Sequence, residues 1–228
     1  MRTRHCVILL FCAALIALAV FHRRWLPPAY DPTQPLDLRA AWTIMTPFKL
    51  RLLASSPALC HAALRTSSLP VQGQPHRGTE ACPLQDVFTV GGGAVSLSPA
   101  SFLASCNLAV RWSLFETQVA GPVTRATFHS DLSRIRHVGS FACRDVRDRP
   151  GTQSSHATAD AIDVSAFILA DGREIPVSAW NARGPAGPYL HRMRDQACRV
   201  FGTVLSPDYN SLHTGHFHLQ ATGFGLCR

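Results

Sequence analysis

Residues 154–163 read S-S-H-A-T-A-D-A-I-D, and residues 213–218 read H-T-G-H-F-H. Polar and apolar residues alternate at the end of both stretches, as they do along a strand with one buried face. On such strands Asp163 points to one face of the first strand, and His216 and His218 share one face of the second. If the two strands are neighbours, they present one carboxylate and two imidazoles to one cleft.

Two histidines and one carboxylate are a common ligand set for catalytic zinc, whose fourth position stays open for water. The first stretch adds a further imidazole, His156, seven residues before Asp163. The residue types therefore indicate a zinc site.

Four segments of the chain resemble the extensin-like C-terminal domain proteins of bacteria: the S-x-H-A-x-x-x-A-I-D stretch, the ACRVFGTVL segment at 197–205, the P-D-Y-N turn at 207–210 and the H-F-H ending. The resemblance covers roughly residues 82–228. That family is similar in turn to zinc D-alanyl-D-alanine peptidases and murein endopeptidases, which share a hedgehog-like fold. The resemblance therefore implies a zinc peptidase fold of this kind.

The resemblance also implies a role for individual residues. His156, Asp163 and His218 match the ligands of Zn²⁺ in the similar peptidases. Arg144 corresponds to the arginine that binds the substrate carbonyl or the developing oxyanion, a task suited to a guanidinium. Ser154 matches a serine that hydrogen-bonds the substrate or holds the loop.

The general base is less clearly marked. Similar peptidases have a glutamate three residues before the last ligand, but this chain has Gly215 there. The extensin-like family commonly has Asp-His-Phe-His at this ending, and often an aspartate in place of Gln220. The remaining candidate bases are His216 and His213, because an imidazole with a pKa of about 6.5 suits a base at neutral pH.

Two further positions depart from the family pattern. Ala159 stands where glycine is common, and Asp160 where asparagine is common. Glycine adopts positive φ much more readily than alanine. The family pattern therefore does not by itself fix the conformation of the loop between His156 and Asp163.

Residues 7–21 are almost wholly apolar and are flanked by basic residues. A run of about 15 residues is shorter than the ~20 of a full membrane span, and it fits a short signal anchor or the core of a cleaved signal peptide. We interpret residues 1–24 as a signal anchor, a single-pass transmembrane helix in the inner membrane with the domain facing the periplasm. The alternative is cleavage near residues 17–19 and release into the periplasm.

Residues 25–80 are interpreted as a proline-rich linker and lead-in segment, and residues 81–228 as the extensin-like domain. Within the lead-in, residues 49–54 favour a short helix, and residues 67–78 favour a loop. No function is assigned to residues 37–80.

Six cysteines lie outside the apolar run: Cys60, Cys82, Cys106, Cys143, Cys198 and Cys227. An even set in an exported domain predicts disulfides, and six cysteines allow fifteen pairings. At least two of the last three are expected to be oxidised. The chain has no C-x-x-C, which argues against a thiolate zinc site.

The coarse pattern predicts an α+β domain, a small antiparallel sheet with helices packed on it. Residues 82–97 favour strands around a glycine turn, and 134–138 favour another strand. One helix is expected to begin with Ser98 as its cap and to stop before Gly121. A second helix is expected to begin near Pro188.

The formal net charge of +8 suits anionic partners such as cell wall or lipid headgroups. Nucleic acid is disfavoured as a partner because the basic residues are dispersed and no nucleic-acid motif is visible.

These observations lead to a hypothesis of a membrane-anchored zinc metallopeptidase that cleaves an amide in peptidoglycan stem peptides or crosslinks. His216 would be the base, and Arg144 would hold the oxyanion. The preference for D-amino acids rests on the resemblance alone. The alternative is a catalytically degenerate, zinc-stabilised module that binds cell wall or a partner, which Gly215 and Gln220 favour. The pattern indicates no oligomeric state.

Overall fold

A mixed sheet forms the centre of the folded body in the computed structural model, which describes residues 2–147 and 149–228. Its strand order is β12-β10-β11-β8-β5-β3, and β9 also pairs with β8. The strands are β3 (Ser96–Ser98), β5 (Leu132–Gly139), β8 (Ala161–Leu169), β9 (Glu174–Pro176), β10 (Thr203–Leu205), β11 (Phe217–Gln220) and β12 (Leu226–Cys227). The predicted α+β class is confirmed.

The sheet differs from the prediction at its two ends. The pairs β3–β5 and β10–β12 are parallel, whereas the central pairs are antiparallel. Between β3 and β5 the chain forms another strand and a long helical stretch before it returns. A crossover of this length brings a strand back in the same direction, which a short hairpin cannot do.

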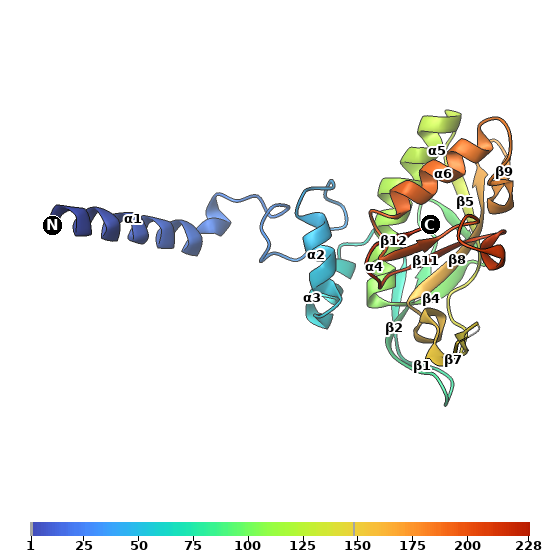
Figure 1. Ribbon diagram of the computed structural model, residues 1–228, viewed down its shortest axis with the longest axis horizontal. Helices are drawn as coiled ribbons and strands as arrows, with labels where there is room; N and C mark the ends of the chain where they lie inside the picture. Colours follow the sequence, from blue (N-terminus) through green and yellow to red (C-terminus); the bar gives the residue numbers. More distant parts are fainter. Residues whose placement is uncertain (1, 148) are drawn as a thin grey trace.

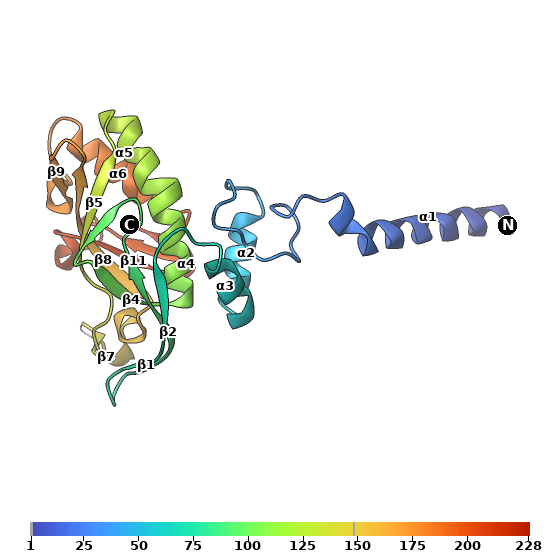
Figure 2. The same cartoon turned by 180° about the vertical axis from the view of Figure 1, so that it is seen from behind.

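A second sheet has the order β1-β2-β4 and contains a long hairpin that extends from the body (Figures 1 and 2). Its strands are β1 (Val71–Gly78), β2 (Pro83–Gly91) and β4 (Ser101–Ser105), and a separate small hairpin consists of β6 (Asp145–Val146) and β7 (Arg149–Gln153). The prediction of a loop over 67–78 is wrong for β1, because its backbone pairs with β2 along its length. Backbone pairing satisfies these polar groups whatever the side chains are.

The helices α4 (Cys106–Leu114) and α5 (Gly121–Phe128) follow one another along one long helical stretch, and α6 (Ala186–Ala197) packs beside α5 (Figures 1 and 2). The lead-in contains α2 (Thr46–Leu53), which confirms the predicted short helix, and α3 (Pro57–Leu64). Short helical turns are η1 (His22–Arg24), η3 (Ser155–Thr158), η4 (Val177–Ala179) and η5 (Ser211–His213). The helix predicted near Pro188 is confirmed as α6.

The first predicted helix begins and ends elsewhere. Ser105, not Ser98, is its cap, and the Ser105 hydroxyl oxygen accepts a hydrogen bond from the backbone N–H of Leu108 at 3.1 Å. The helix also continues past Gly121, because the π-helical residues η2 (Phe115–Ala120) join α4 to α5. The wider π turn precedes Pro122, whose ring would meet a carbonyl of the preceding turn in an ordinary α-helix.

Large apolar side chains from helices and sheet meet in one core. Trp112 and Phe115 of the long helical stretch, Tyr189 of α6, Phe167 of β8 and Phe217 of β11 are all fully buried. Burial of side chains of this size contributes about 1.5–3 kcal/mol each, so the core holds β8 and β11 in place behind the candidate site.

Helix α1 (Arg2–Val20) projects away from the folded body (Figure 1). Its described apolar side chains are exposed, as Leu10 and Phe11 show. Within the described residues, no helix combines the length and apolar character needed to cross a bilayer. The predicted transmembrane anchor therefore has no support from the structure.

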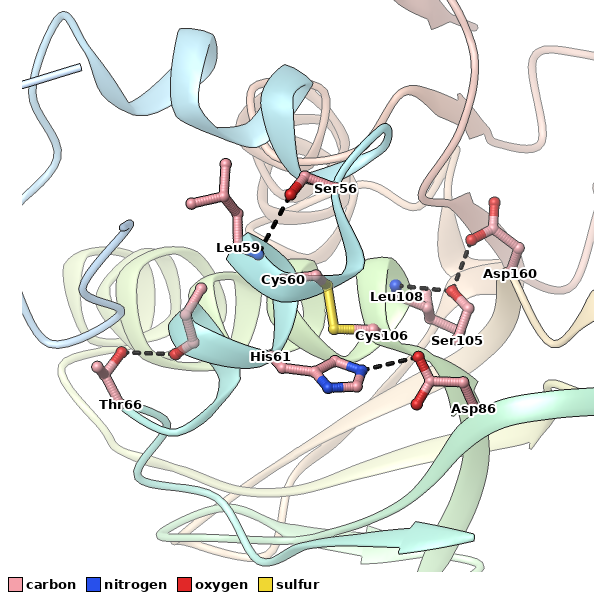
Figure 3. The surroundings of a disulfide bond; sticks show 11 residues. Ser56, Leu59, Cys60, His61, Thr66, Asp86, Ser105, Cys106, Leu108 and Asp160 are labelled. Carbon is pink, nitrogen blue, oxygen red and sulfur yellow. Dashed lines mark hydrogen bonds and ion pairs between the residues drawn. A yellow bond between two sulfur atoms is a disulfide. The ribbon is translucent and has the colours of Figure 1, made fainter. Parts of the chain in front are cut away.

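Three disulfides confirm the prediction for the six cysteines. The bonded pairs are Cys60–Cys106, Cys82–Cys143 and Cys198–Cys227. The first ties α3 of the lead-in to the start of α4, beside an ion pair between His61 and Asp86 at 2.7 Å (Figure 3). The lead-in segment is thus joined covalently to the body.

Candidate metal centre

Strands β8 and β11 are neighbours, as the alternation required. They pair antiparallel with His218 directly opposite Asp163. Phe217 and Leu219 are fully buried on the other face, as alternation along a strand with one buried face requires. The turn η3 brings His156 to the same cleft, so that three side chains from three segments meet.

The three side chains converge on one point. Nδ1 of His218 lies 3.0 Å from Oδ1 of Asp163, and Nε2 of His156 lies 3.2 Å from the same oxygen and 3.1 Å from Nδ1 of His218. Tetrahedral zinc with bonds of about 2.0–2.1 Å holds its ligand atoms ~3.3 Å apart. The spacing therefore fits a zinc-sized cation, and these three residues are also the potential metal-binding group found among the described residues.

His156 is oriented by backbone groups around it. Its Nδ1 lies 2.9 Å from the carbonyl oxygen of Ser140, to which it donates, so that Nε2 faces the cluster. The Ser154 hydroxyl accepts from the His156 backbone N–H at 3.3 Å and caps η3. A ligand histidine whose other nitrogen donates to a carbonyl has a fixed tautomer and ring position.

His218 is oriented by side chains. Its Nε2 lies 3.3 Å from Oε1 of Gln220 and 3.4 Å from the hydroxyl oxygen of Ser155. With Nε2 donating to one of these oxygens, Nδ1 can present a lone pair to a cation bound by the cluster. Gln220 therefore supplies an acceptor where the family often has aspartate. The strand alternation contained this signal, since residues 218 and 220 share a face, whereas nothing in the sequence pointed to Ser140 or Ser155.

The charge of Asp163 is stabilised although the residue is largely buried. Burial alone raises the pKa of the carboxyl, but hydrogen bonds and positive potential from His156 and His218 lower it further than burial raises it. The resulting pKa lies below the ordinary value. A carboxylate that stays charged between two imidazole nitrogens is suited to hold a cation.

Two more histidines lie on the open side of Asp163. Nε2 of His216 is 3.7 Å from Oδ2 of Asp163, and the rings of His213 and His216 are 5.1 Å apart. Burial lowers the pKa of His216, and the charge of Asp163 offsets this only in part. Burial and the positive potential of His216 and His218 lower the pKa of His213 to about 4. Both rings are thereby favoured in their neutral form at neutral pH.

Comparison with known proteins identifies the family. Residues 58–228 match the family model described as Extensin-like protein C-terminus. The chain belongs to this family. No curated protein and no solved structure matches the chain. The similarity to zinc peptidases stays a prediction.

The extensin-like match begins at residue 58, inside α3, although the sequence placed the start of the domain at 81. The disulfide Cys60–Cys106 binds that helix to α4. The lead-in helix is thus part of the matched region.

Arg144 of the extensin-like domain is exposed, and its guanidinium donates to the carbonyl oxygen of Asp145 at 3.2 Å. No contact between its side chain and the three converging residues is found in the described part of the chain.

A different arginine influences the histidines: the charge of Arg147 contributes to lowering the pKa of His213 and of His216. Sequence reasoning missed Arg147, which lies outside the family motif.

The loop between His156 and Asp163 has the conformation that glycine would favour. Ala159 adopts φ +51° and is fully buried. Asp160 stabilises the loop from the other side: its Oδ1 accepts from the Ser105 hydroxyl and its Oδ2 from the Thr222 hydroxyl, both at 2.7 Å. The loop thus adopts a positive φ without glycine, and links to two distant segments support it.

Proposed function

We propose that this extensin-like domain is a zinc-dependent peptidase of the periplasm that hydrolyses an amide in peptidoglycan stem peptides or crosslinks. The observation that carries the proposal is the convergence of His156, Asp163 and His218 within 3.0–3.2 Å of one another. The substrate class rests on the family's resemblance to cell-wall peptidases.

His156, Asp163 and His218 would hold the zinc ion. When bound, zinc polarises a carbonyl and lowers the pKa of water. Three protein ligands leave one position free for water, as in catalytic rather than structural zinc sites.

His216 takes the role of proton acceptor. Its Nε2 lies 3.7 Å from Oδ2 of Asp163, and burial favours the neutral form of its imidazole. His213 lies beside it, with Nδ1 2.7 Å from Oδ1 of Asn210, and is the second candidate. A base placed in this way contributes about 10²–10⁴-fold to a rate.

Arg144 binds the substrate carbonyl or oxyanion in this proposal, after a rotation of its exposed side chain toward the cleft. Ser154 holds η3 through its oxygen, and its hydroxyl proton is left to donate to the substrate.

The proposal places the domain outside the cytoplasm. Three disulfides in one domain are typical of proteins in an oxidising compartment such as the periplasm. Residues 1–24 would attach it to the inner membrane, and release after cleavage of that segment is the alternative.

A second function, a zinc-stabilised module that binds cell wall without cleaving it, is favoured by Gly215. This residue is exposed and offers no carboxylate to orient His216. Such a module would bind zinc through His156, Asp163 and His218 but would not hydrolyse peptides.

One experiment separates the two functions. The purified protein is analysed for metal content and incubated with muropeptides, with and without added zinc, and new amines are detected by mass spectrometry. About one zinc per chain and zinc-dependent new amines are expected. Bound zinc with intact, bound muropeptides would establish the module instead, and a chain that takes up no zinc would reject both functions.

A further inference from the structure

The segment 140–144 lies beside η3 and is joined to it by backbone contacts. The carbonyl oxygen of Ser140 accepts from Nδ1 of His156 at 2.9 Å, and the N–H of Ala142 donates to the carbonyl oxygen of His156 at 3.2 Å. Two residues further along the segment, the carbonyl oxygen of Arg144 accepts from the N–H of Ser154 at 3.1 Å. The position of His156 thus depends on where this segment lies.

The first residues of the segment are packed, since Ser140 is buried and Phe141 packs against the cluster that contains Leu84 and Ala159, but the residues after Ala142 have few buried contacts. Residues 143–147 are exposed, and the hairpin β6–β7 that follows is exposed at every residue whose burial is described. Segments with few buried contacts open locally at low free-energy cost. A constraint on the segment must therefore come from a covalent bond or from a neighbouring element.

The disulfide Cys82–Cys143 supplies that constraint. Cys143 lies within the segment, whereas Cys82 is buried at the start of β2, where the hairpin β1–β2 begins its second strand. Gln153 of β7 also contacts the Cys82 sulfur, with Nε2 at 3.7 Å. The disulfide thus bonds the exposed end of the segment to the paired hairpin β1–β2.

We propose that the Cys82–Cys143 disulfide is a positioning element of the metal centre: it fixes the exposed end of the segment 140–144 and so keeps the segment's hydrogen bonds to His156 in place, which sets the metal affinity. This inference rests on the proposed function, because it requires that the cluster binds zinc. Hydrogen-bond partners of ligand histidines typically change metal affinity by about 10–100-fold when they are lost. If the segment moves freely, His156 is without these hydrogen-bond partners for part of the time.

The chain offers a matched control in Cys198–Cys227. That disulfide joins the end of α6 to the edge strand β12, and it reaches His218 only through the intervening strand β10. His218 is held by β8 on its other side and by Gln220. Loss of either disulfide reduces the stability of the fold, but only the loss of Cys82–Cys143 frees a hydrogen-bond partner of a ligand.

The test compares three full-length proteins: wild type, Cys82→Ser with Cys143→Ser, and Cys198→Ser with Cys227→Ser. Zinc affinity is measured by competition with a chromophoric chelator, far below each protein's melting temperature. Cobalt substitution reports the coordination geometry by its visible spectrum. We expect the first double variant to bind zinc about 10–100-fold more weakly with an altered cobalt spectrum, and the second to match wild type.

Equal zinc affinity and equal spectra in all three proteins would overturn the inference and leave the proposed metal centre intact. A similar loss of affinity in both double variants would also overturn it, since the effect would then reflect stability alone. Wild type without zinc binding would reject the proposed function and the inference with it.

A variant that keeps all disulfides covers the case in which the first double variant does not fold. Ala142→Pro removes the N–H that donates to the carbonyl oxygen of His156, and it also fixes the φ angle of residue 142. It should weaken zinc binding in the same direction. Unchanged affinity in Ala142→Pro would count against the inference.

Discussion

Two buried carboxyl groups in this protein have pKa values that are shifted in opposite directions. Asp163 lies on β8 among histidines, and its pKa is below the ordinary value. Glu116 lies in the π-helical stretch behind the sheet and is 3 % exposed. Burial raises the pKa of Glu116 to about 7, and hydrogen bonds from the backbone N–H groups of Val95 and Gly93 oppose the rise only in part.

The difference shows what partners do to a buried charge. Both carboxyls lose hydration, which disfavours the charged form. Asp163 recovers the loss from His156 and His218, whereas Oε2 of Glu116 has no hydrogen-bond partner in the described structure. Burial by itself therefore does not keep a carboxyl group charged. Neighbouring nitrogen atoms that donate hydrogen bonds or supply positive potential do.

The largest expected effect is on the metal. Asp163→Ala should lose most bound zinc, because it removes the only oxygen ligand and leaves the rings of His156 and His218 facing each other. Zinc content of the purified variant is the measurement. Asp171→Ala, an exposed carboxylate paired with Arg173, is the control and should keep its zinc. Stoichiometric zinc in Asp163→Ala would refute the ligand assignment.

The next effect concerns His216, whose Nε2 lies near Oδ2 of Asp163. His216→Ala should keep zinc, since the three converging atoms remain, and should lower muropeptide turnover by about 10²–10⁴-fold. His61→Ala, on the exposed surface of α3, should leave both unchanged. If His216→Ala lost zinc as completely as Asp163→Ala, His216 would be a ligand, and His213 would become the base.

The smallest effect concerns Glu116. Its pKa of about 7 in the folded state lies above the ordinary 4.5, so the folded state binds the proton more tightly than the unfolded state. Its contribution to stability is therefore full below about pH 4.5 and is lost as the pH rises to about 7. Glu116→Gln should remove this dependence and stabilise the protein above about pH 7 by on the order of 2–3 kcal/mol.

Urea unfolding of wild type and Glu116→Gln at about pH 4.5, 6 and 8 measures this effect. The two proteins should be closest at the lowest pH. An equal difference at all three values would show that Glu116 does not titrate in this range, and its comparison with Asp163 would no longer hold.

The convergence of Asp163 and His218 was accessible from the sequence because strand alternation is a local property, whereas His156 was added by the family resemblance. Alternation assigned Asp163 and His218 to strand faces that share one cleft, and the two residues lie opposite each other on neighbouring strands. The six paired cysteines were also predictable as a set. Their partners were not, because fifteen pairings are compatible with the same sequence.

Errors occurred where tertiary contacts outweigh local preference. Ser98 has the character of a helix cap, yet residues 101–105 pair with β2 and the helix starts at Ser105 instead. Gly121 and Pro122 read as a helix end, but the π turn carries the helix through them. In each case packing on the sheets decides between two local conformations of similar free energy.

By itself, the sequence determined which side chains can form the centre, since residue type and a two-residue period are local properties. The tertiary structure decided what surrounds them: the Ser140 carbonyl on His156, and the positive charge of Arg147, which acts on His213 and His216. These partners come from segments that share no pattern with the motif. They meet because the central sheet pairs β8 with β11 and because the Cys82–Cys143 disulfide joins the segment after β5 to the hairpin β1–β2.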